Sequence, residues 1–422
     1  MGDRYDLGCR WWGDGRTLLI ILLEDSSCSH FSCVSSEKGP VMHLETIAVH
    51  SGRMVDPSTG AVAPPIHLST TFERDVDGGF SRGFAYSRHD NPNRHSLETC
   101  LAALEGGAAA VAFPSGMAAI SAVIEALHRT HPGRLILPQD MYFGVRSLLT
   151  DTEFGRTLDA TFVDMTDLSA VERACTDGTI GLIWIETPSN PLVSVVDVAE
   201  IAKIAKAYGA ASCVDNTWAT PLLQRPLELG ADVVVHSLTK YIGGHSDVMA
   251  GAVVVREEGP HLDELLAIQH HRGVLPSPFD CWLALRGVAT LSARMTVHCS
   301  NALHLARHLE NHPKIVAVHY PGLPSHAGHT IAARQMNAFG GMLSIELPGG
   351  RKNAMAVAAA LQLFTRATSL GGNHSLVEHR ASIEGPSTMA PEGLLRLSIG
   401  LEHVDDLRAD FDQSLKAVFQ ER

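Results

Sequence analysis

The sequence predicts an α/β protein whose larger part is a mostly parallel, doubly wound sheet with helices on both faces. Between residues 111 and 255, short apolar runs rich in β-branched residues alternate with helical patterns. Strands that are buried on both faces have this continuously apolar character. Beyond about residue 287 the pattern changes to long helices and a few strands, which predicts a smaller C-terminal α+β domain.

Composition favours an enzyme acting on a small molecule. The 422 residues are 45% hydrophobic and 19% charged, which is enough to bury a sizeable core. A net charge of −13, without any Lys/Arg-rich run, argues against nucleic-acid or membrane partners. Eight cysteines without a C-x-x-C pair are typical of reduced thiols, so we expect a cytoplasmic protein. His304, His308 and His312 recur every four residues, but no carboxylate or cysteine cluster accompanies them, and we expect no metal site.

Two N-terminal segments differ from the rest of the chain. Residues 1–41 contain an apolar run at 18–23 that is too short for a membrane span. We expect either a disordered leader outside the fold or an artefact of start-site choice, with Met42 opening the folded protein; a targeting role stays open. Residues 42–95 are rich in turn residues and poor in helix or strand patterns. Such an arm buries little of itself, so it is expected to pack on another subunit of a homo-oligomer.

The remaining elements follow in order. A helix is expected over 96–104, ending before Gly106, and a second from Gly116 to about Arg129. The predicted strands of the large domain are residues 111–113, 135–137, 161–163, 180–185, 212–214, 233–235 and 252–255. In the C-terminal part we expect helices at 291–309 and 354–364, and strands at 316–319, 342–346 and 394–399. The expected domains are therefore the arm, a large domain over 96–287 and a C-terminal domain over 288–422.

Polar residues follow four of the predicted strands directly. In a sheet of this kind ligands collect beyond the carboxyl ends of the strands. A strand-to-helix turn also presents backbone N–H groups that favour an anion. The four segments are Ser115-Gly116-Met117, Glu186-Thr-Pro-Ser-Asn190-Pro191, Asp215-Asn-Thr217 and Ser237-Leu-Thr239-Lys240.

Lys240 is the most informative of these residues. A lysine among apolar strands tends to lose its proton, and its neutral amine is then a nucleophile toward a carbonyl. Ser237 and Thr239 point to one side and are placed to donate to a phosphate, although an isolated S-x-T-K is more often a surface lysine after a strand. Asp215 suits a protonated ring nitrogen, and Tyr142 is placed to stack on a ring. Pyridoxal 5′-phosphate (PLP) uses all of these groups at once.

Nine motifs resemble those of the Cys/Met-metabolism (transsulfuration) family of PLP-dependent enzymes, from about residue 43 to the C-terminus. They are Tyr86-Ser-Arg88, the four segments above (the last continuing to Asp247-Val), Pro276-Ser-Pro-Phe-Asp280 with Arg286-Gly, Tyr320-Pro-Gly-Leu-Pro-Ser-His326, Phe339-Gly-Gly-Met342 and Ser369-Leu-Gly-Gly372. The resemblance implies PLP fold type I, the aspartate-aminotransferase-like fold. It also implies a homotetramer of tight dimers.

The resemblance also implies roles for individual residues. Lys240 would bond covalently to the cofactor aldehyde and shuttle protons. Asp215 would pair with the ring nitrogen and Tyr142 would stack on the ring. Substrate would be bound through its carboxylate by Arg396, with Asn190 assisting and Ser369 orienting Lys240. The phosphate would be held by Gly116, Met117, Ser237 and Thr239, together with Tyr86 and Arg88 of a neighbouring subunit.

The implied reaction is γ-elimination or γ-replacement on a homoserine- or homocysteine-derived amino acid. Thr368 stands where cystathionine γ-synthases and γ-lyases commonly have Glu, so a contact to the distal amino group of cystathionine is expected to be missing. Phe143 follows Tyr142 without the cysteine that marks methionine γ-lyases. The segment from His379 to Gly385, which includes Arg380 and Glu384, replaces the small-residue, histidine-ending stretch of many members and is expected to reshape the distal pocket. β-Lyase, methionine γ-lyase or O-acylhomoserine sulfhydrylase activity stay open. An aminotransferase or a catalytically silent oligomeric member are further alternatives.

Overall fold

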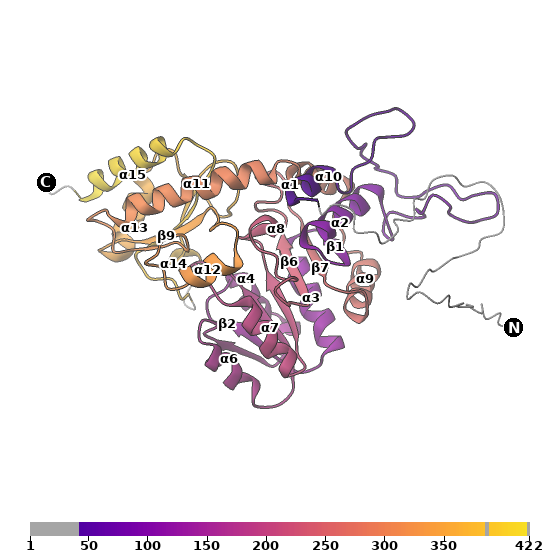
Figure 1. Cartoon of the computed structure of the whole chain (residues 1–422), viewed down its shortest axis with the longest axis horizontal. Coiled ribbons are helices and arrows are strands. Elements are labelled where there is room, and N and C mark those ends of the chain that lie inside the picture. Colours follow the sequence, from indigo (N-terminus) through magenta and orange to yellow (C-terminus); the bar gives the residue numbers. More distant parts are fainter. Residues whose placement is uncertain (1–41, 385–387, 420–422) are drawn as a thin grey trace, which may run out of the picture. The chain divides into compact units, whose positions relative to one another are not determined.

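The computed structural model of the chain describes residues 42–384 and 388–419 (Figure 1). The predicted leader, residues 1–41, lies outside the described residues. Within the described part, no helix combines the length and apolar character needed to cross a membrane.

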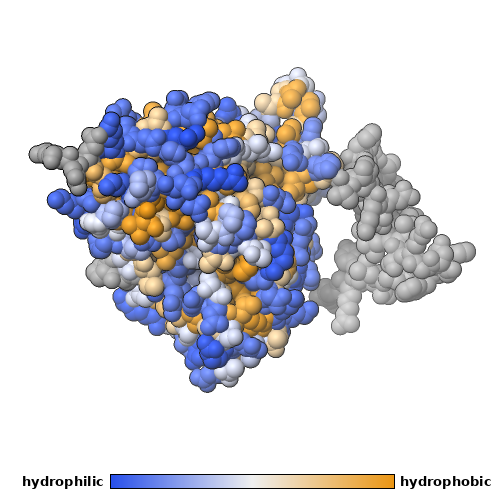
Figure 2. Space-filling view, turned by 60° about the vertical axis from the view of Figure 1, so that its left-hand side comes forward, coloured by the Kyte–Doolittle hydropathy of each residue, from blue (hydrophilic) through white to orange (hydrophobic). Residues whose placement is uncertain are grey.

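The arm is mostly irregular, as its turn-rich sequence predicts, but it begins with a short helix that was not expected. This helix, α1, spans Leu44–His50. The only β pairing in the segment from there to residue 91 is an isolated bridge between Thr71 and Tyr86. Several apolar side chains of the arm are largely exposed: Met54 is 79% exposed, Leu68 73% and Val62 81%. Apolar residues also interrupt the mostly polar face of the molecule seen in Figure 2.

The larger sheet has seven strands in the order β1-β7-β6-β5-β4-β2-β3. Strands β2 to β6 run parallel, whereas β7 is antiparallel to both β1 and β6. The expected mostly parallel sheet is therefore present with one reversed strand. The strands span Ala109–Phe113, Arg134–Pro138, Ala160–Val163, Ile180–Glu186, Ala211–Asp215, Val233–Ser237 and Gly251–Val255 for β1 to β7.

Helices cover both faces of this sheet, and the alternation of side chains along the strands explains why. On β6, Val233 and Val235 belong to the apolar cluster beneath α3 (Gly116–Thr130) and α9 (Pro260–Arg272). Val234 belongs instead to the cluster beneath α2 (Pro92–Glu105) and α10 (Pro278–Val288). A strand buried on both faces is apolar at consecutive positions, and β6 has this pattern over Val233 to Val235 before it ends with His236 and Ser237. The remaining helices of this region are α4 (Phe143–Asp151), α5 (Glu153–Arg156), α6 (Leu168–Cys175), α7 (Val198–Ala207) and α8 (Thr220–Leu223).

The second sheet has five strands in the order β10-β11-β12-β9-β8, antiparallel except for the β10–β11 pair. These strands span Thr365–Arg366, Leu376–His379, Leu394–Ser398, Met342–Glu346 and Ala317–His319, in sheet order. Their register places Arg396 between Glu378 and Ser344. The accompanying helices are α11 (Leu291–Glu310), α12 (His329–Gln335), α13 (Gly350–Ala360), α14 (Ala381–Glu384) and α15 (Val404–Phe419).

Two helix boundaries differ from those predicted. Helix α2 begins at Pro92, four residues before the expected start, because the Asn91 side chain caps it by accepting from the Asn93 N–H and proline suits the first turn. Helix α13 begins at Gly350 and ends at Ala360, whereas 354–364 was expected. The apolar residues Leu361 and Phe364 that extended the helical pattern lie in the core after the helix has ended.

Candidate functional site

A cavity of about 410 Å³ opens beyond the carboxyl ends of β4, β5 and β6. Part of its wall comes from the second sheet, through Arg396 of β12 and the loop that precedes β11. Ten of the twelve residues predicted for the site line this one cavity: Gly116, Met117, Tyr142, Asn190, Asp215, Ser237, Thr239, Lys240, Ser369 and Arg396. Segments separated by up to 280 positions in the sequence, from residue 116 to residue 396, thus meet at one place.

One end of the cavity suits a phosphate. Helix α3 begins there, and the Ser115 hydroxyl caps it by accepting from the Ala118 N–H at 3.1 Å. The free amides at the start of a helix favour an anion. The hydroxyls of Ser237 and Thr239 face the same end, and Thr239 Oγ1 also accepts from the Ala250 N–H at 3.1 Å. The start of α3 and these two hydroxyls together suit an anion such as a phosphate.

Gly116 allows β6 to approach the start of α3 closely. A Cβ atom added at Gly116 would lie 2.8 Å from the Ser237 Cβ. We therefore expect Gly116→Ala to displace Ser237 and to weaken binding of a phosphorylated cofactor about tenfold, an overpacking effect. Fluorescence titration of the apoprotein with PLP measures this. The control is Gly79→Ala, where a methyl group would meet the side chains of Asp77 and Asp75, at 3.1 and 3.6 Å. Unchanged PLP affinity in Gly116→Ala would contradict the assignment.

Lys240 lines the cavity, and its amine is hydrogen-bonded to a hydroxyl group. Its Nζ donates to Ser369 Oγ at 2.9 Å. Burial, with the nearby Arg396 charge, lowers the pKa of Lys240 to about 8. Ser369 has a φ of 106°, which is a strained conformation for a residue other than glycine. Beyond it, Gly371 has a φ of 75°, and a Cβ there would lie 2.7 Å from the Tyr241 nitrogen. The Ser369 loop is therefore pressed closely against the lysine.

The lowered pKa predicts when Lys240 reacts with an aldehyde. Only the neutral amine is nucleophilic, and its fraction rises as pH rises through the pKa. Condensation of the apoprotein's Lys240 with PLP should therefore accelerate between about pH 7 and 9 and level off above that. Borohydride trapping followed by peptide mass spectrometry measures the rate. A midpoint near the ordinary lysine pKa of about 10.4 would contradict the prediction.

Two carboxyl groups, the buried Glu186 and the half-buried Asp215, lie side by side where β4 and β5 end. The two strands pair with Glu186 and Asp215 in register. Asp215 Oδ1 accepts from the Thr217 N–H at 3.0 Å, and burial raises the pKa of Asp215. A buried carboxyl group that faces a cavity suits a cationic partner such as a protonated ring nitrogen, because pairing offsets the cost of desolvation.

Glu186 is a site residue to which sequence reasoning gave no role. Its carboxyl oxygens accept from the Tyr142 N–H at 3.0 and 2.8 Å and from the Asn190 N–H at 3.0 Å. Burial and the charge of Asp215 raise the pKa of Glu186 well above its usual value. Glu186 therefore fixes the backbone of two predicted site residues. An acidic residue directly after an apolar strand was the available signal.

Tyr142 presents its ring to the cavity from the start of α4. A Cβ on Gly144 would lie 2.5 Å from the Tyr142 ring, so only glycine leaves the ring room in this position. The Tyr142 hydroxyl has a raised pKa because it is largely buried, and the Arg380 charge is the main influence that opposes this. A protonated phenol in this place is suited to donate a proton.

Arg396 is buried on β12 and held on three sides. Its Nη1 donates to Asn190 Oδ1 at 3.0 Å, and its Nη2 donates to the Ser369 carbonyl at 3.0 Å and to Glu378 Oε2 at 2.6 Å. These bonds orient the planar guanidinium, which can bind a carboxylate with two parallel hydrogen bonds. Asn190 and Ser369 thus position Arg396, in addition to the roles expected for them.

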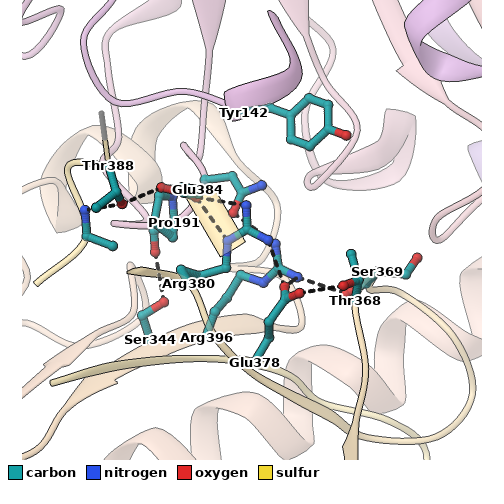
Figure 3. A network of polar contacts seen from close by, with 12 residues as sticks. Tyr142, Pro191, Ser344, Thr368, Ser369, Glu378, Arg380, Glu384, Thr388 and Arg396 are labelled. Atoms are coloured by element: carbon teal, nitrogen blue, oxygen red, sulfur yellow. Dashed lines mark hydrogen bonds and ion pairs between the residues drawn. The ribbon is translucent and has the colours of Figure 1, made fainter. Parts of the chain in front are cut away.

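Two charged residues beside Arg396 were not assigned to the site. Arg380 lines the cavity, and Glu378 Oε2 also accepts from Arg380 Nη1 at 2.7 Å (Figure 3). Glu378 Oε1 accepts from the Thr368 hydroxyl at 2.6 Å. Thr368 was expected to leave this part of the site without a polar contact to substrate. The structure places the carboxylate of Glu378 directly against it.

Tyr86 and Arg88 do not line the cavity of this chain. Tyr86 is 44% exposed on the arm, and the Arg88 guanidinium lies 5.8 Å from the Tyr86 ring centre. Arg88 Nη1 donates to the His270 carbonyl at 2.9 Å. Their expected role in a neighbouring subunit's site therefore stays a prediction.

Comparisons with known proteins agree with this geometry. The profile of the family described as "Cys/Met metabolism PLP-dependent enzyme" matches residues 45–416. A cystathionine gamma-synthase of Mycobacterium tuberculosis is 48% identical over 378 residues, which cover 88% of this chain and 96% of the relative. A cystathionine beta-lyase of Coxiella burnetii is 43% identical over 383 residues, covering 88% and 98%. One similar solved structure is cystathionine gamma synthase of Xanthomonas oryzae pv. oryzae in complex with aminoacrylate and cysteine. It aligns with a TM-score of 0.83 at 40% sequence identity, and the alignment covers 89% of this chain and 98% of that chain.

Proposed function

Because the chain belongs to the Cys/Met metabolism family of PLP-dependent enzymes, we propose that it exchanges the γ-substituent of a homoserine ester for a thiol. The chain is a transsulfuration-type enzyme that uses PLP and acts on a small amino acid. The predicted family, PLP fold type I and cofactor are therefore confirmed. The exact substrate and the choice between replacement and elimination belong to the proposal.

The residues of the cavity fit PLP. We assign the phosphate to the start of α3 with Gly116, Met117, Ser237 and Thr239, the ring nitrogen to Asp215, and the ring face to Tyr142. The aldehyde carbon belongs to Lys240, whose lowered pKa supplies the neutral amine that bond formation requires. When bound, PLP would withdraw electrons from the α- and β-carbons of the substrate and so make their hydrogens acidic.

The chain's own residues would then handle substrate and protons. Arg396 binds the α-carboxylate through its fork, and the Ser369 hydroxyl holds Lys240 Nζ, which accepts the α-proton. Tyr142 donates a proton to the departing ester oxygen. In the net reaction the Cγ–O bond breaks and a Cγ–S bond forms. The thiol proton leaves with the released carboxylic acid, so atoms and charge balance.

The observation that supports this proposal most is the convergence of Lys240, Ser369 and Arg396 on one cavity, joined by the hydrogen bonds of Ser369 to both charged side chains. This arrangement fixes the distance between the proton-accepting amine and the group that binds the α-carboxylate. It suits α-proton removal from a bound amino acid. The 48% identity to a cystathionine gamma-synthase over nearly its whole length favours replacement. Elimination is the second candidate, favoured by the 43% identity to a cystathionine beta-lyase.

A product survey tests the proposal. The purified holoenzyme is incubated with O-acetylhomoserine, O-succinylhomoserine or cystathionine, with and without cysteine, and products are identified by mass spectrometry. We expect a thioether only when an ester and a thiol are both present. An α-keto acid and ammonia from cystathionine would favour elimination, and pyridoxamine phosphate would indicate an aminotransferase. Protein that stays colourless with added PLP would refute the enzymatic proposal and favour the silent oligomeric member.

We also propose a cytoplasmic homotetramer built from tight dimers, in which Tyr86 and Arg88 of the arm reach the PLP phosphate of a neighbouring subunit. The exposed apolar side chains of the arm support the oligomer, because such surface is usually covered by a partner. Light scattering of the eluting protein measures the oligomeric state, and a monomer with full activity would refute the shared site.

The cysteines support the cytoplasmic location. Four of the five cysteines in the described residues are buried free thiols, which suits a reducing compartment.

A further inference from the structure

Arg380 is a buried charged residue in the cavity wall that the proposed reaction does not use. Its side chain is 1% exposed and comes from the residue directly after β11. In the proposed reaction the α-carboxylate is bound by Arg396 alone. Figure 3 shows the two guanidinium groups next to each other, with Glu378 bonded to both. The cavity wall therefore carries a second guanidinium, which shares Glu378 with Arg396 and is also held by Glu384.

The hydrogen bonds of Arg380 fix the orientation of its guanidinium but use only some of its N–H groups. Its Nε and Nη2 donate to Glu384 Oε1 at 3.0 and 2.7 Å, and its Nη1 donates to Glu378 Oε2 at 2.7 Å. A guanidinium has five N–H bonds. Three of these N–H bonds donate to Glu384 and Glu378. The other two have no hydrogen-bond acceptor among the residues that the structure describes. A buried donor without a partner is costly, and the cavity is where an acceptor can enter.

Arg380 lies toward the part of the cavity where the γ-substituent would leave. Its guanidinium carbon lies 5.4 Å from the ring centre of Phe143, the neighbour of Tyr142. The Arg380 charge lowers the pKa of the Tyr142 hydroxyl more than the Arg396 charge does, and for Lys240 the order of the two arginines is reversed. Arg396 therefore acts on the α-carbon end of the substrate. Arg380 acts on the end where Tyr142 would protonate the leaving group.

We propose that Arg380 binds a second carboxylate, carried by the group that leaves or enters at the substrate's γ-carbon. Two sources have this chemistry: an ester formed from a dicarboxylic acid, and an incoming thiol that is itself an amino acid. In both, two parallel N–H···O bonds from a guanidinium already held in place by two carboxylates favour a planar anion. This inference rests on the proposed γ-replacement. It adds that the group leaving or entering at the γ-carbon carries a negative charge.

A kinetic experiment with two arms shows whether the second carboxylate belongs to the ester or to the thiol. In the first, O-succinylhomoserine is compared with its neutral half-amide, with sulfide as the thiol. In the second, cysteine is compared with cysteamine, which lacks only the carboxylate, with O-acetylhomoserine as the ester. We expect kcat/KM to favour the carboxylate-bearing member about 10- to 100-fold in at least one arm, mainly through KM.

Three variants and a control identify the residue responsible. Arg380→Met should remove the preference, so that kcat/KM falls at least about tenfold more for the carboxylate-bearing member than for the matched carboxylate-free compound, while Arg380→Lys should retain part of the preference. Arg380→Met combined with Glu384→Gln removes one charge of each sign and covers the case in which the single variant does not fold. Arg351→Met, at an exposed site on α13, should behave as the parent enzyme.

The outcomes separate this inference from the proposed function. Equal losses for both members of each pair would mean that Arg380 only neutralises Glu378 and Glu384, and would overturn the inference. Turnover without any charge preference in the parent enzyme would overturn it as well, and would leave γ-replacement standing. Absence of a γ-replacement product from every combination (homocysteine from sulfide, a thioether from cysteine or cysteamine) would refute the proposed function and the inference together.

Discussion

Lys240→Ala is expected to abolish turnover, with kcat reduced by at least about 10⁴-fold, because one substitution removes both the amine that bonds PLP and the base that accepts the α-proton. The visible absorption of the bound cofactor should disappear as well. Steady-state kinetics and the absorption spectrum of protein incubated with PLP measure the two effects. The fold should persist, since the structure shows only one hydrogen bond from the lysine amine, to Ser369.

Two controls separate the chemistry of Lys240 from general damage. Lys352→Ala changes an exposed lysine on α13 and should leave kcat and the spectrum unchanged. Lys240→Arg keeps a positive charge but supplies no neutral amine, so it should be as inactive as the alanine variant. Substantial turnover by Lys240→Ala or Lys240→Arg would contradict the assigned role.

The large sheet was predictable because its inner strands contain runs of consecutive apolar residues, although β5 includes Ser212 and β6 ends with His236 and Ser237. On β6, the side chains of Val233, Val234 and Val235 all pack into apolar clusters, and a strand with this pattern must be covered on both faces. The parallel order also places the strand ends at one edge, which is how four short polar segments identified a single site. The reversed direction of β7 was not predictable, because its sequence is as apolar as that of its parallel neighbours.

The parts of the site that the sequence did not predict depend on distances between remote segments. The departure of residues 379–385 from the family pattern pointed to a changed distal pocket, but no role was assigned to Glu378 or Arg380, which lie on and directly after the short strand β11. Their role follows from the register of β11 against β12, which places Glu378 beside Arg396. The short helix α1 was missed because its seven residues lie between turn signals. The roles of Tyr86 and Arg88 require a second subunit and stay predictions.

Glu378 links the two arginines of the cavity and so connects the α-carboxylate site to the proposed second carboxylate site. The pKa of Glu378 is lowered because the charges of Arg396 and Arg380 and the Thr368 hydroxyl outweigh the effect of its burial. An ionised Glu378 competes with substrate for Arg396, yet it also keeps the guanidinium aligned when substrate is absent. Binding at Arg396 is therefore expected to depend on this carboxylate as much as on the arginine itself.

Arg396→Ala is expected to lower kcat/KM for the amino-acid substrate by about 10²- to 10³-fold, with most of the loss in KM. The substitution removes the fork that binds the α-carboxylate. It also leaves the Asn190 side-chain oxygen, the Ser369 carbonyl and the Glu378 carboxylate each without one donor. Arg396→Lys keeps the charge but not the paired geometry, so a smaller loss of about 10- to 100-fold is expected.

A substrate analogue in which a hydrogen replaces the α-carboxylate tests whether the loss of kcat/KM in Arg396→Ala comes from the carboxylate contact. We expect this analogue to be a poor substrate for the parent enzyme and to lose little further activity in Arg396→Ala, because the missing contact is the one that the variant removes. Arg366→Ala, which changes an exposed arginine on β10, is the matched control. If Arg396→Ala lowers kcat/KM for the analogue as much as for the substrate, the arginine supports the structure of the pocket and does not bind the carboxylate.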